Sequence, residues 1–295
     1  MGVAQDFDAE GNQYQPREFC KFLLAMQSTF GSEGIAHQRI DFLTKFLRKV
    51  GITGNKPWRE ILMTEAQKFG RHKDVVLEFG VYKGRSTNLL ARMLPNATVY
   101  AFDSFCGFPV DGRSDWQQDF SVDHLPKVRR NVNLQVGYFE KTLPVFIERH
   151  GNDIRNRVGL VHIDCDIYSS TLTVFNAIGE FLSEGVVIVF DEIINYPEFA
   201  FNEALALYDF LLRRGLDAKW STNIGKMWLV DESEISASWI GWKDFRQHGF
   251  FQNQSVVLCN RGEGGLIDKS MFLDPSPALV DYVVSGMEDR GLHSA

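Results

Sequence analysis

Short apolar runs alternate with segments of helical apolar spacing through the middle of the chain. Two of the runs, "VGLVHI" and "GVVIVF", are continuous, as is typical of strands buried on both faces of a parallel sheet. The pattern predicts strands over 75–80, 98–103, 133–137, 159–164 and 185–190. Because strands and helices alternate, the sequence predicts a doubly wound α/β domain.

Helical spacing of apolar residues also marks the first third of the chain and two later segments. The pattern predicts helices over 17–30, 37–50, 57–69, 170–182 and 200–214. The helix at 57–69 begins with Pro57, where the missing N–H costs nothing because the first turn has no partner for it.

The last part of the chain gives a weaker pattern. Segments 216–223 and 225–230 are a short gap apart, and we expect an antiparallel hairpin at the edge of the sheet. "SPALVDYVVSGMEDRG" predicts a helix with Ser276 as its N-cap. The aromatic run 239–251 is either core, dimer contact or a lid over the substrate. We expect 231–295 to be an appendage to the main domain.

Composition and charge narrow the possible partners. Of 295 residues, 44% are apolar, so the chain can bury a sizeable core. The net charge of -7 argues against a nucleic-acid partner, which usually needs a basic face. No apolar run approaches the length of about 18 residues that a membrane span needs. The polar, acidic start and the four widely spaced cysteines indicate a cytoplasmic protein with reduced thiols.

Polar and acidic residues gather where the predicted strands end. Glu78 lies in the first strand and is followed by Gly80 and Gly84, while Asp103 ends the second strand. In an open α/β sheet, ligands bind outside the carboxyl ends of the strands. The glycine spacing does not match G-x-G-x-x-G, and Glu78 would repel a pyrophosphate. A cationic ligand with a ribose, such as S-adenosylmethionine, fits these residues better.

Five motifs in order carry a resemblance to a known family. "LEFGVYKGRST", "AFDSFCGFP", "GYFEKTLP", "HIDCDIYSST" and "VIVFDE" resemble the class I S-adenosylmethionine-dependent methyltransferases. Within them, the chain most resembles the macrocin O-methyltransferase group, which modifies sugar hydroxyls on natural products. The first motif is also similar to that of catechol O-methyltransferase.

The resemblance covers residues 60–230 and implies a domain organisation. It implies a Rossmann-like, mostly parallel, seven-stranded sheet, to which this chain adds N-terminal helices and a C-terminal extension. We expect an N-terminal helical cap at 1–60 and a methyltransferase domain at 61–230. The extension, 231–295, would pack on the main domain or on a partner subunit.

The resemblance also implies a binding site for S-adenosylmethionine. Glu78 would face the cationic amino-acid end of the cofactor, and Asp103 would hold the ribose hydroxyls. The other residues implied to line the cofactor are Gly80, Tyr82, Gly84, Ser86, Ser104, Gly137, Tyr138, Phe139 and Asp164. Taken from the residues alone, Asp103 could instead cap the turn that follows it.

A metal site is implied beside the cofactor. Asp164, Asp191 and Glu192 match positions that bind a magnesium ion in both relatives, and carboxylates are the hard oxygen ligands that Mg²⁺ prefers. The same acids could instead form a solvated rim. The general base is left open between Asp164, Asp166 and His162, which share one face if the strand continues that far. His162 could instead pack or hydrogen-bond within the sheet.

These observations predict a Mg²⁺-dependent O-methyltransferase acting on a hydroxyl of a small natural product, with a sugar hydroxyl favoured. The alternatives are a metal-independent N- or O-methyltransferase, a nicotinamide-dependent oxidoreductase and a non-catalytic binding protein. The expected partner is a small hydroxylated molecule, with neither nucleic acid nor membrane. A homo-oligomer stays open.

Overall fold

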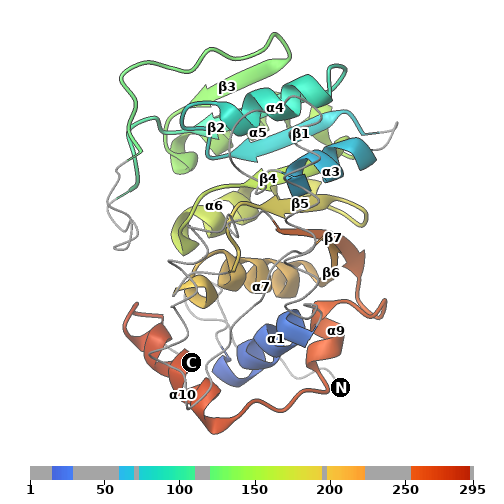
Figure 1. Ribbon diagram of the computed structural model, residues 1–295, viewed down its shortest axis with the longest axis vertical. Coiled ribbons are helices and arrows are strands. Elements are labelled where there is room, and N and C mark those ends of the chain that lie inside the picture. Colours follow the sequence, from blue (N-terminus) through green and yellow to red (C-terminus); the bar gives the residue numbers. More distant parts are fainter. Residues whose placement is uncertain are drawn as a thin grey trace.

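The computed structural model describes residues 15–28, 60–69, 73–109, 120–194, 198–222 and 254–292. A seven-stranded sheet runs through this part of the chain (Figure 1). Its strands are β1 (Val75–Phe79), β2 (Thr98–Asp103), β3 (Val132–Val136), β4 (Val158–Ile163), β5 (Val187–Phe190), β6 (Leu216–Thr222) and β7 (Gln254–Asn260). Their order is β3-β2-β1-β4-β5-β7-β6, with β1 to β5 parallel and β7 antiparallel to both neighbours.

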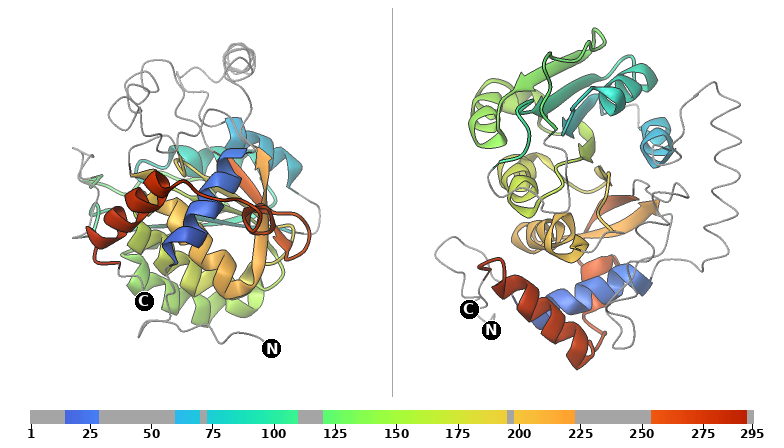
Figure 2. Two further views of the ribbon diagram at one scale, coloured as in Figure 1. Left: turned by 90° about the horizontal axis from the view of Figure 1, so that it is seen from below. Right: turned by 60° about the vertical axis from the view of Figure 1, so that its left-hand side comes forward.

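Helices cover both faces of the sheet, which confirms the predicted doubly wound fold. On one face lie α3 (Glu60–Lys68) and α4 (Arg85–Met93), and on the other α5 (Phe139–Ile154), α6 (Tyr168–Ile178) and α7 (Glu203–Arg214), as the right-hand view of Figure 2 shows. Beyond α7 pack α1 (Pro16–Ser28), α9 (Leu266–Ser270) and α10 (Pro277–Glu288). Two short 3₁₀ turns, η2 (Gly179–Phe181) and η3 (Phe199–Phe201), flank α6 and α7.

Each face of the sheet has its own apolar core. The larger core lies under α5, α6 and α7 and takes in α1, where Phe19 and Phe22 each contact the Tyr208 ring with centroids 5.2 Å apart. The smaller core lies under α3 and α4, and includes Leu62 and Leu90. Strand side chains alternate between the two cores, as the period of two requires.

The strand and helix predictions agree well with the structure. Each of the five predicted parallel strands is present within two residues of its expected start. The predicted helix at 17–30 begins one residue after the start of α1 and ends two residues beyond it, and the predicted helix at 57–69 contains α3. Ser276 is the N-cap of α10, because its hydroxyl oxygen accepts the Leu279 N–H at 3.3 Å. The predicted helix 37–50 and the aromatic run 239–251 lie outside the described residues.

The strand β6 pairs with a strand that lies much later in the chain. The first predicted strand, 216–223, is present as β6, and the expected partner at 225–230 lies outside the described residues. The neighbour that β6 does have is β7, which is inserted between β5 and β6. The sheet therefore continues past the expected domain boundary at residue 230.

We predict that a chain ending at residue 230 does not fold. Such a chain lacks β7, so β6 loses the strand that joins it to β5. It also lacks the buried apolar residues of α9 and α10, which belong to the larger core. Far-UV circular dichroism and size-exclusion chromatography of this truncation are compared with those of a control chain ending at Leu292. A soluble truncated monomer with the control's melting temperature would contradict this role of β7.

Candidate active site

The predicted site residues meet at the carboxyl edge of the sheet, around the neighbouring strands β1 and β4. In the sheet, β1 has its successor β2 on one side, and β4 has its successor β5 on the other side. The strand order therefore reverses between β1 and β4, and this place is the topological switch point of the sheet. Glu78 of β1 stands directly opposite His162 of β4. Both lie one strand repeat beyond residues of the smaller core, so their side chains project from the α3–α4 face.

Glu78 and His162 form a fully buried pair. Both side chains are 0% exposed, and the His162 Nδ1 lies 3.1 Å from the Glu78 Oε1. The second atom of each group, Glu78 Oε2 and His162 Nε2, has no hydrogen-bond partner within the described part of the protein. A buried polar atom without a partner costs about 1–3 kcal/mol, so both atoms are candidates to contact a ligand.

The loop after β1 runs very close to the end of β4. Gly80 has a φ of +96°, and a Cβ placed there would lie 1.9 Å from the backbone oxygen of Asp164. The Asp164 N–H donates to the Phe79 carbonyl at 2.8 Å, which fixes this approach. Glycine is therefore required at position 80 both by its backbone angle and by the space.

The other predicted residues of this loop lead into α4. Tyr82 takes a left-handed backbone with a φ of 49°, which is uncommon for a residue with a side chain. Its ring meets the Phe120 ring edge-on, with centroids 5.3 Å apart. Gly84, with a φ of +68°, is the N-cap of α4, and Ser86 is buried in the first turn of that helix. This part of the site is thus built from unusual backbone angles.

Asp103 ties together the loops after β1 and β2. Its Oδ2 accepts the N–H groups of Val81 and Tyr82, both at 2.7 Å, and its Oδ1 accepts the Phe105 N–H at 2.6 Å. The turn-capping contact considered from the sequence is therefore present. A carboxylate has about four lone-pair positions, so these three bonds leave one on Oδ1 for a ligand hydroxyl. Ser104 closes the following turn by donating to the Gly107 carbonyl at 2.8 Å.

Three of the residues implied to line the cofactor follow β3 at the same edge. The Gly137 N–H donates to the Asp103 carbonyl at 2.9 Å, and Gly137 has a φ of +134°. Tyr138 is 39% exposed, while the Phe139 ring packs edge-on against Phe79 with centroids 5.7 Å apart. The structure thus brings the predicted cofactor residues of three strands to one place. Their roles stay predictions.

The candidate metal ligands differ from the predicted set. His162, Asp164 and Asp191 each offer one ligand atom, and these atoms all lie within 4.8 Å of one another. The group contains His162 where Glu192 was expected. Glu192 is only 3% exposed and is not part of this cluster.

Asp164 lies in a strongly acidic environment. Burial raises the pKa of its carboxyl well above the usual range. Neighbouring carboxylates raise this pKa further, and in decreasing order they are Asp191, Asp166, Glu203 and Glu78. A bound cation would relieve this repulsion.

Asp166 does not continue the strand as the alternation argument required. The strand β4 ends at Ile163, and Asp166 has a left-handed backbone with a φ of 65°. Asp166 is 8% exposed. Its place near Asp164 therefore comes from the turn into α6, not from strand alternation.

Glu203 was missed by the sequence reasoning. It opens α7, is 0% exposed, and its Oε1 accepts the Cys165 N–H at 3.4 Å. It therefore supports the loop that carries Asp164 and Asp166. No local signal in the sequence links it to that loop, because 38 residues separate Glu203 from Cys165.

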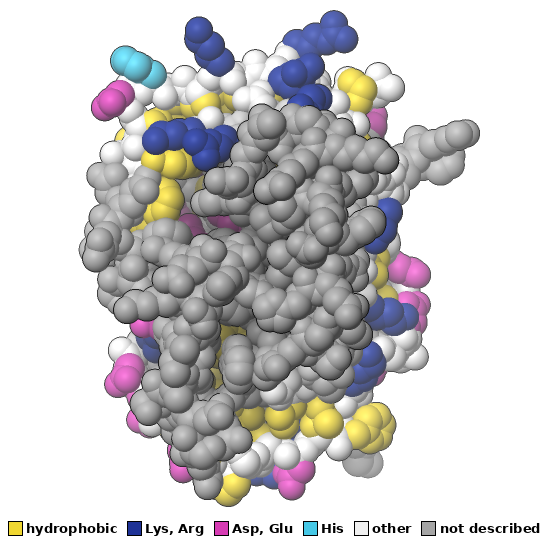
Figure 3. Space-filling view, in the orientation of Figure 1, with side chains coloured by type: hydrophobic (Ala, Val, Ile, Leu, Met, Phe, Trp, Pro, Cys, Tyr) yellow, Lys and Arg dark blue, Asp and Glu magenta, His cyan; other side chains and the backbone are white. Residues whose placement is uncertain are grey.

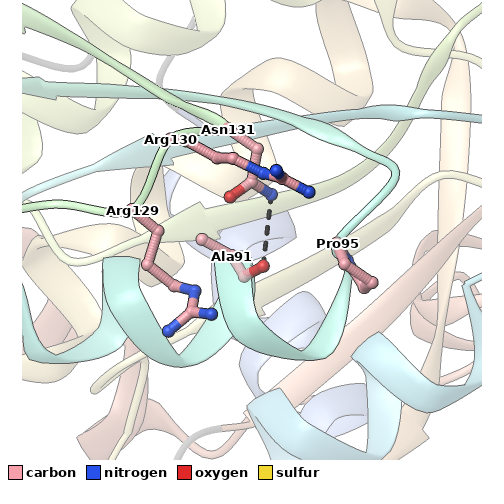
Figure 4. Close-up of a pocket in the computed structure, with 5 residues that line it drawn as sticks. All are labelled: Ala91, Pro95, Arg129, Arg130 and Asn131. Atoms are coloured by element: carbon pink, nitrogen blue, oxygen red, sulfur yellow. Dashed lines mark hydrogen bonds between the residues drawn. The ribbon is translucent and has the colours of Figure 1, made fainter.

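A pocket at the opposite edge of the sheet is not part of this site. It is lined by Ala91, Pro95, Arg129, Arg130 and Asn131 (Figure 4), which lie before β2 and β3 begin. The Asn131 side chain donates to the Ala91 carbonyl at 3.1 Å, at the end of α4. Lysine and arginine side chains gather at the top of the molecule in the view of Figure 3. The guanidinium groups of Arg129 and Arg130 point apart (Figure 4).

A known protein family matches the part of the chain that carries the predicted site residues. Residues 77–193 match the model of a family described as a methyltransferase domain, and this range runs from β1 to just beyond the end of β5. The chain carries an S-adenosylmethionine-dependent methyltransferase domain. The methyltransferase resemblance drawn from the five motifs is thereby confirmed. No curated protein sequence matches the chain.

Solved structures of methyltransferases are among the matches. A calicheamicin methyltransferase, CalS11, is 22% identical with a TM-score of 0.46, and the match covers 77% of this chain and 95% of that chain. The O-methyltransferase NovP is 16% identical with a TM-score of 0.43, over 57% of this chain and 76% of that chain. None of the described helices of the methyltransferase chain is long and apolar enough to cross a membrane.

We predict that Gly80→Ala destabilises the methyltransferase more than Gly185→Ala. Both glycines have a left-handed φ, +96° and +80°, but a Cβ at position 185 would meet nothing within 4 Å. Backbone strain of about 1–3 kcal/mol is common to both variants, and the clash with Asp164 adds about 1–3 kcal/mol at position 80. Urea denaturation measures the free energy of unfolding of both variants and of the unchanged protein. Equal losses of stability would contradict the close approach.

We also predict that Asp164→Asn stabilises the metal-free protein. Because the pKa of Asp164 is raised, the native state keeps its proton to a higher pH than the unfolded chain does. The contribution of this group to stability therefore falls as the pH rises above about 4, the ordinary pKa of an aspartate. Asparagine cannot ionise, so at pH 8 the variant should melt about 2–4 °C higher, as about 1 kcal/mol produces in a chain of this size.

Thermal melts in EDTA at pH 5 and pH 8 check this prediction. The gain should be larger at pH 8. Asp281→Asn, at an exposed position of α10, is the matched control and should change little at either pH. A lower melting temperature for Asp164→Asn at both pH values would show that the Asp164 carboxylate stabilises the metal-free fold.

Proposed function

We propose that the chain is a divalent-metal-dependent O-methyltransferase acting on a hydroxyl of a small natural product, with a sugar hydroxyl as the favoured acceptor. The observation that carries the proposal is the cluster of His162, Asp164 and Asp191 next to the loop after β1. A site that only bound the cofactor would have no use for this cluster. The motif resemblance to the macrocin O-methyltransferase group supports the choice of acceptor.

The described residues fit S-adenosylmethionine. Glu78 Oε2, buried and without a partner in the described chain, would hold the cationic ammonium group. The remaining acceptor position on Asp103 Oδ1 would take a ribose hydroxyl, while Gly80 and Gly137 leave the backbone open at the strand ends. When bound, S-adenosylmethionine supplies a methyl group on a sulfonium, which is an electrophile without further activation.

Proton removal from the acceptor hydroxyl falls to the residues around Asp164. Asp164 would accept this proton through the carboxylate oxygen that does not hold the ion. The other candidate bases at this edge of the sheet are Asp166 and the buried Nε2 of His162. Alignment of the hydroxyl by these groups can supply about 7–11 kcal/mol of the barrier reduction.

Asp164 and Asp191, which belong both to the set expected from the sequence and to the cluster, would hold the divalent ion, for which Mg²⁺ is the candidate expected from the sequence. A divalent ion supplies Lewis acidity that lowers the pKa of an alcohol when it is bound. Asp191 is 9% exposed and its N–H donates to the Ile163 carbonyl at 2.9 Å, so its place at the edge is fixed by the sheet. We place Asp191 on the acceptor side of the pocket.

Methyl transfer with and without chelator tests the proposal. Labelled S-adenosylmethionine is supplied with a panel of sugar and phenolic hydroxyl acceptors. Excess EDTA should remove most of the turnover and added Mg²⁺ should restore it. Asp191→Asn should lose about 100-fold or more of the turnover, because one ligand of the ion is removed, while cofactor affinity by calorimetry changes less than about twofold.

Asp281→Asn serves as the surface control and should keep the wild-type rate. Full activity in excess EDTA would reject the metal and leave Asp164, Asp166 or His162 as a simple base. Transfer to amine acceptors alone would reject the hydroxyl acceptor and favour an N-methyltransferase.

A further inference from the structure

We propose that His162 is a nitrogen ligand of the metal ion and that Glu78 orients it. The site would then select a transition ion such as Mn²⁺, Fe²⁺, Co²⁺ or Zn²⁺ over Mg²⁺. The inference rests on the proposed function in one respect, that a cation binds at this edge of the sheet. It changes the ligand set expected from the sequence, in which Glu192 was the third ligand.

The first argument is distance. A ring nitrogen of His162 and carboxylate oxygens of Asp164 and Asp191 all lie within 4.8 Å of one another. Two ligands that each stand about 2.0–2.2 Å from one ion can be separated by up to about 4.4 Å. Three ligands around one ion lie closer together than this on average, so a shift of less than about one ångström closes the three atoms around a single ion.

The second argument is the state of the imidazole. A carboxylate can only accept a hydrogen bond, so the contact between Glu78 Oε1 and His162 Nδ1 at 3.1 Å places the hydrogen on Nδ1. In the neutral ring, the form that binds metal, the lone pair is then on Nε2. A carboxylate that holds one imidazole nitrogen while the other binds metal is a common second contact in metalloproteins, and it fixes the ring and raises its basicity.

The third argument is that Nε2 has no other use in the described structure. His162 is 0% exposed, so water does not reach it, and no described donor satisfies Nε2. A histidine that served only to fill the sheet would leave this lone pair buried and unpaired. A cation between Asp164 and Asp191 satisfies it and lowers the repulsion between those two acids.

The ligand set then decides the ion. Mg²⁺ prefers oxygen ligands in octahedral geometry and keeps several waters. Imidazole suits first-row transition ions, whose affinities exceed that of Mg²⁺ at mixed nitrogen and oxygen sites. One imidazole with two carboxylates therefore favours a transition ion.

The experiment measures metal binding by the full chain without cofactor or acceptor. Metal-free protein is titrated with Mn²⁺ and with Mg²⁺ by calorimetry. Pulsed electron paramagnetic resonance on the Mn²⁺-loaded protein then detects ¹⁴N coupling from a coordinated imidazole. We expect ¹⁴N coupling in the wild type and an affinity for Mn²⁺ at least about tenfold above that for Mg²⁺.

Two variants separate the roles of the pair. His162→Gln should abolish the ¹⁴N coupling and lower the Mn²⁺ affinity at least about tenfold. Glu78→Gln keeps an acceptor for Nδ1–H, so it should retain the coupling but lose about 10–100-fold in Mn²⁺ affinity. His150→Gln is the matched control. The His150 ring, on α5, packs against the rings of Tyr100 and Phe146, so the change should not affect either measurement.

Absence of ¹⁴N coupling in the wild type would overturn the inference, as would coupling that persists in His162→Gln. The wild-type spectrum decides the question even if His162→Gln fails to fold. An all-oxygen site that binds Mg²⁺ would leave the proposed function standing, because methyl transfer that depends on a divalent ion is measured separately. Methyl transfer that proceeds fully in excess chelator would reject the proposed metal role itself.

Discussion

The parallel contact between β1 and β4 is the constraint on which the site depends. It places Glu78 opposite His162 inside the sheet, and it carries the Gly80 loop against the backbone of Asp164. Only a residue without a Cβ can follow β1 at this distance. A hydrogen bond from the Asp164 N–H to the Phe79 carbonyl joins the ends of the two strands. The same bond fixes the backbone position from which the Asp164 side chain extends.

A second consequence of this geometry is a concentration of negative charge in a region that water hardly reaches. The pKa of Asp164 is raised by burial and by the acids around it, and Glu203 adds to this from the far side of the sheet. A fold that keeps such a group gives up some stability in the ligand-free state. Proteins keep destabilising charged groups of this kind at active sites, because a positively charged ligand removes the repulsion when it binds.

Much of the fold follows from local patterns in the sequence. Continuous apolar runs identified the five parallel strands, because a strand buried on both faces needs apolar residues at every position. Ser276 was recognisable as a cap because its hydroxyl acts within one helical turn. Glu78, Asp103 and Asp191 were recognised as site residues for a related reason, since topology sends all parallel strand ends to one edge. The helix α5 was not named in advance, although it follows β3 directly.

Tertiary structure decided the rest, because contacts between distant residues leave no local period. The strand β7 enters the sheet between β5 and β6 although it follows β6 in the chain, so its neighbours could not be inferred from its own seven residues. The pairing of Glu78 with His162 needed the register of β1 against β4. The inclusion of His162 with Asp164 and Asp191, in place of Glu192, needed the positions of side-chain atoms. Alternation along a strand could not supply these, because β4 ends before the acids begin.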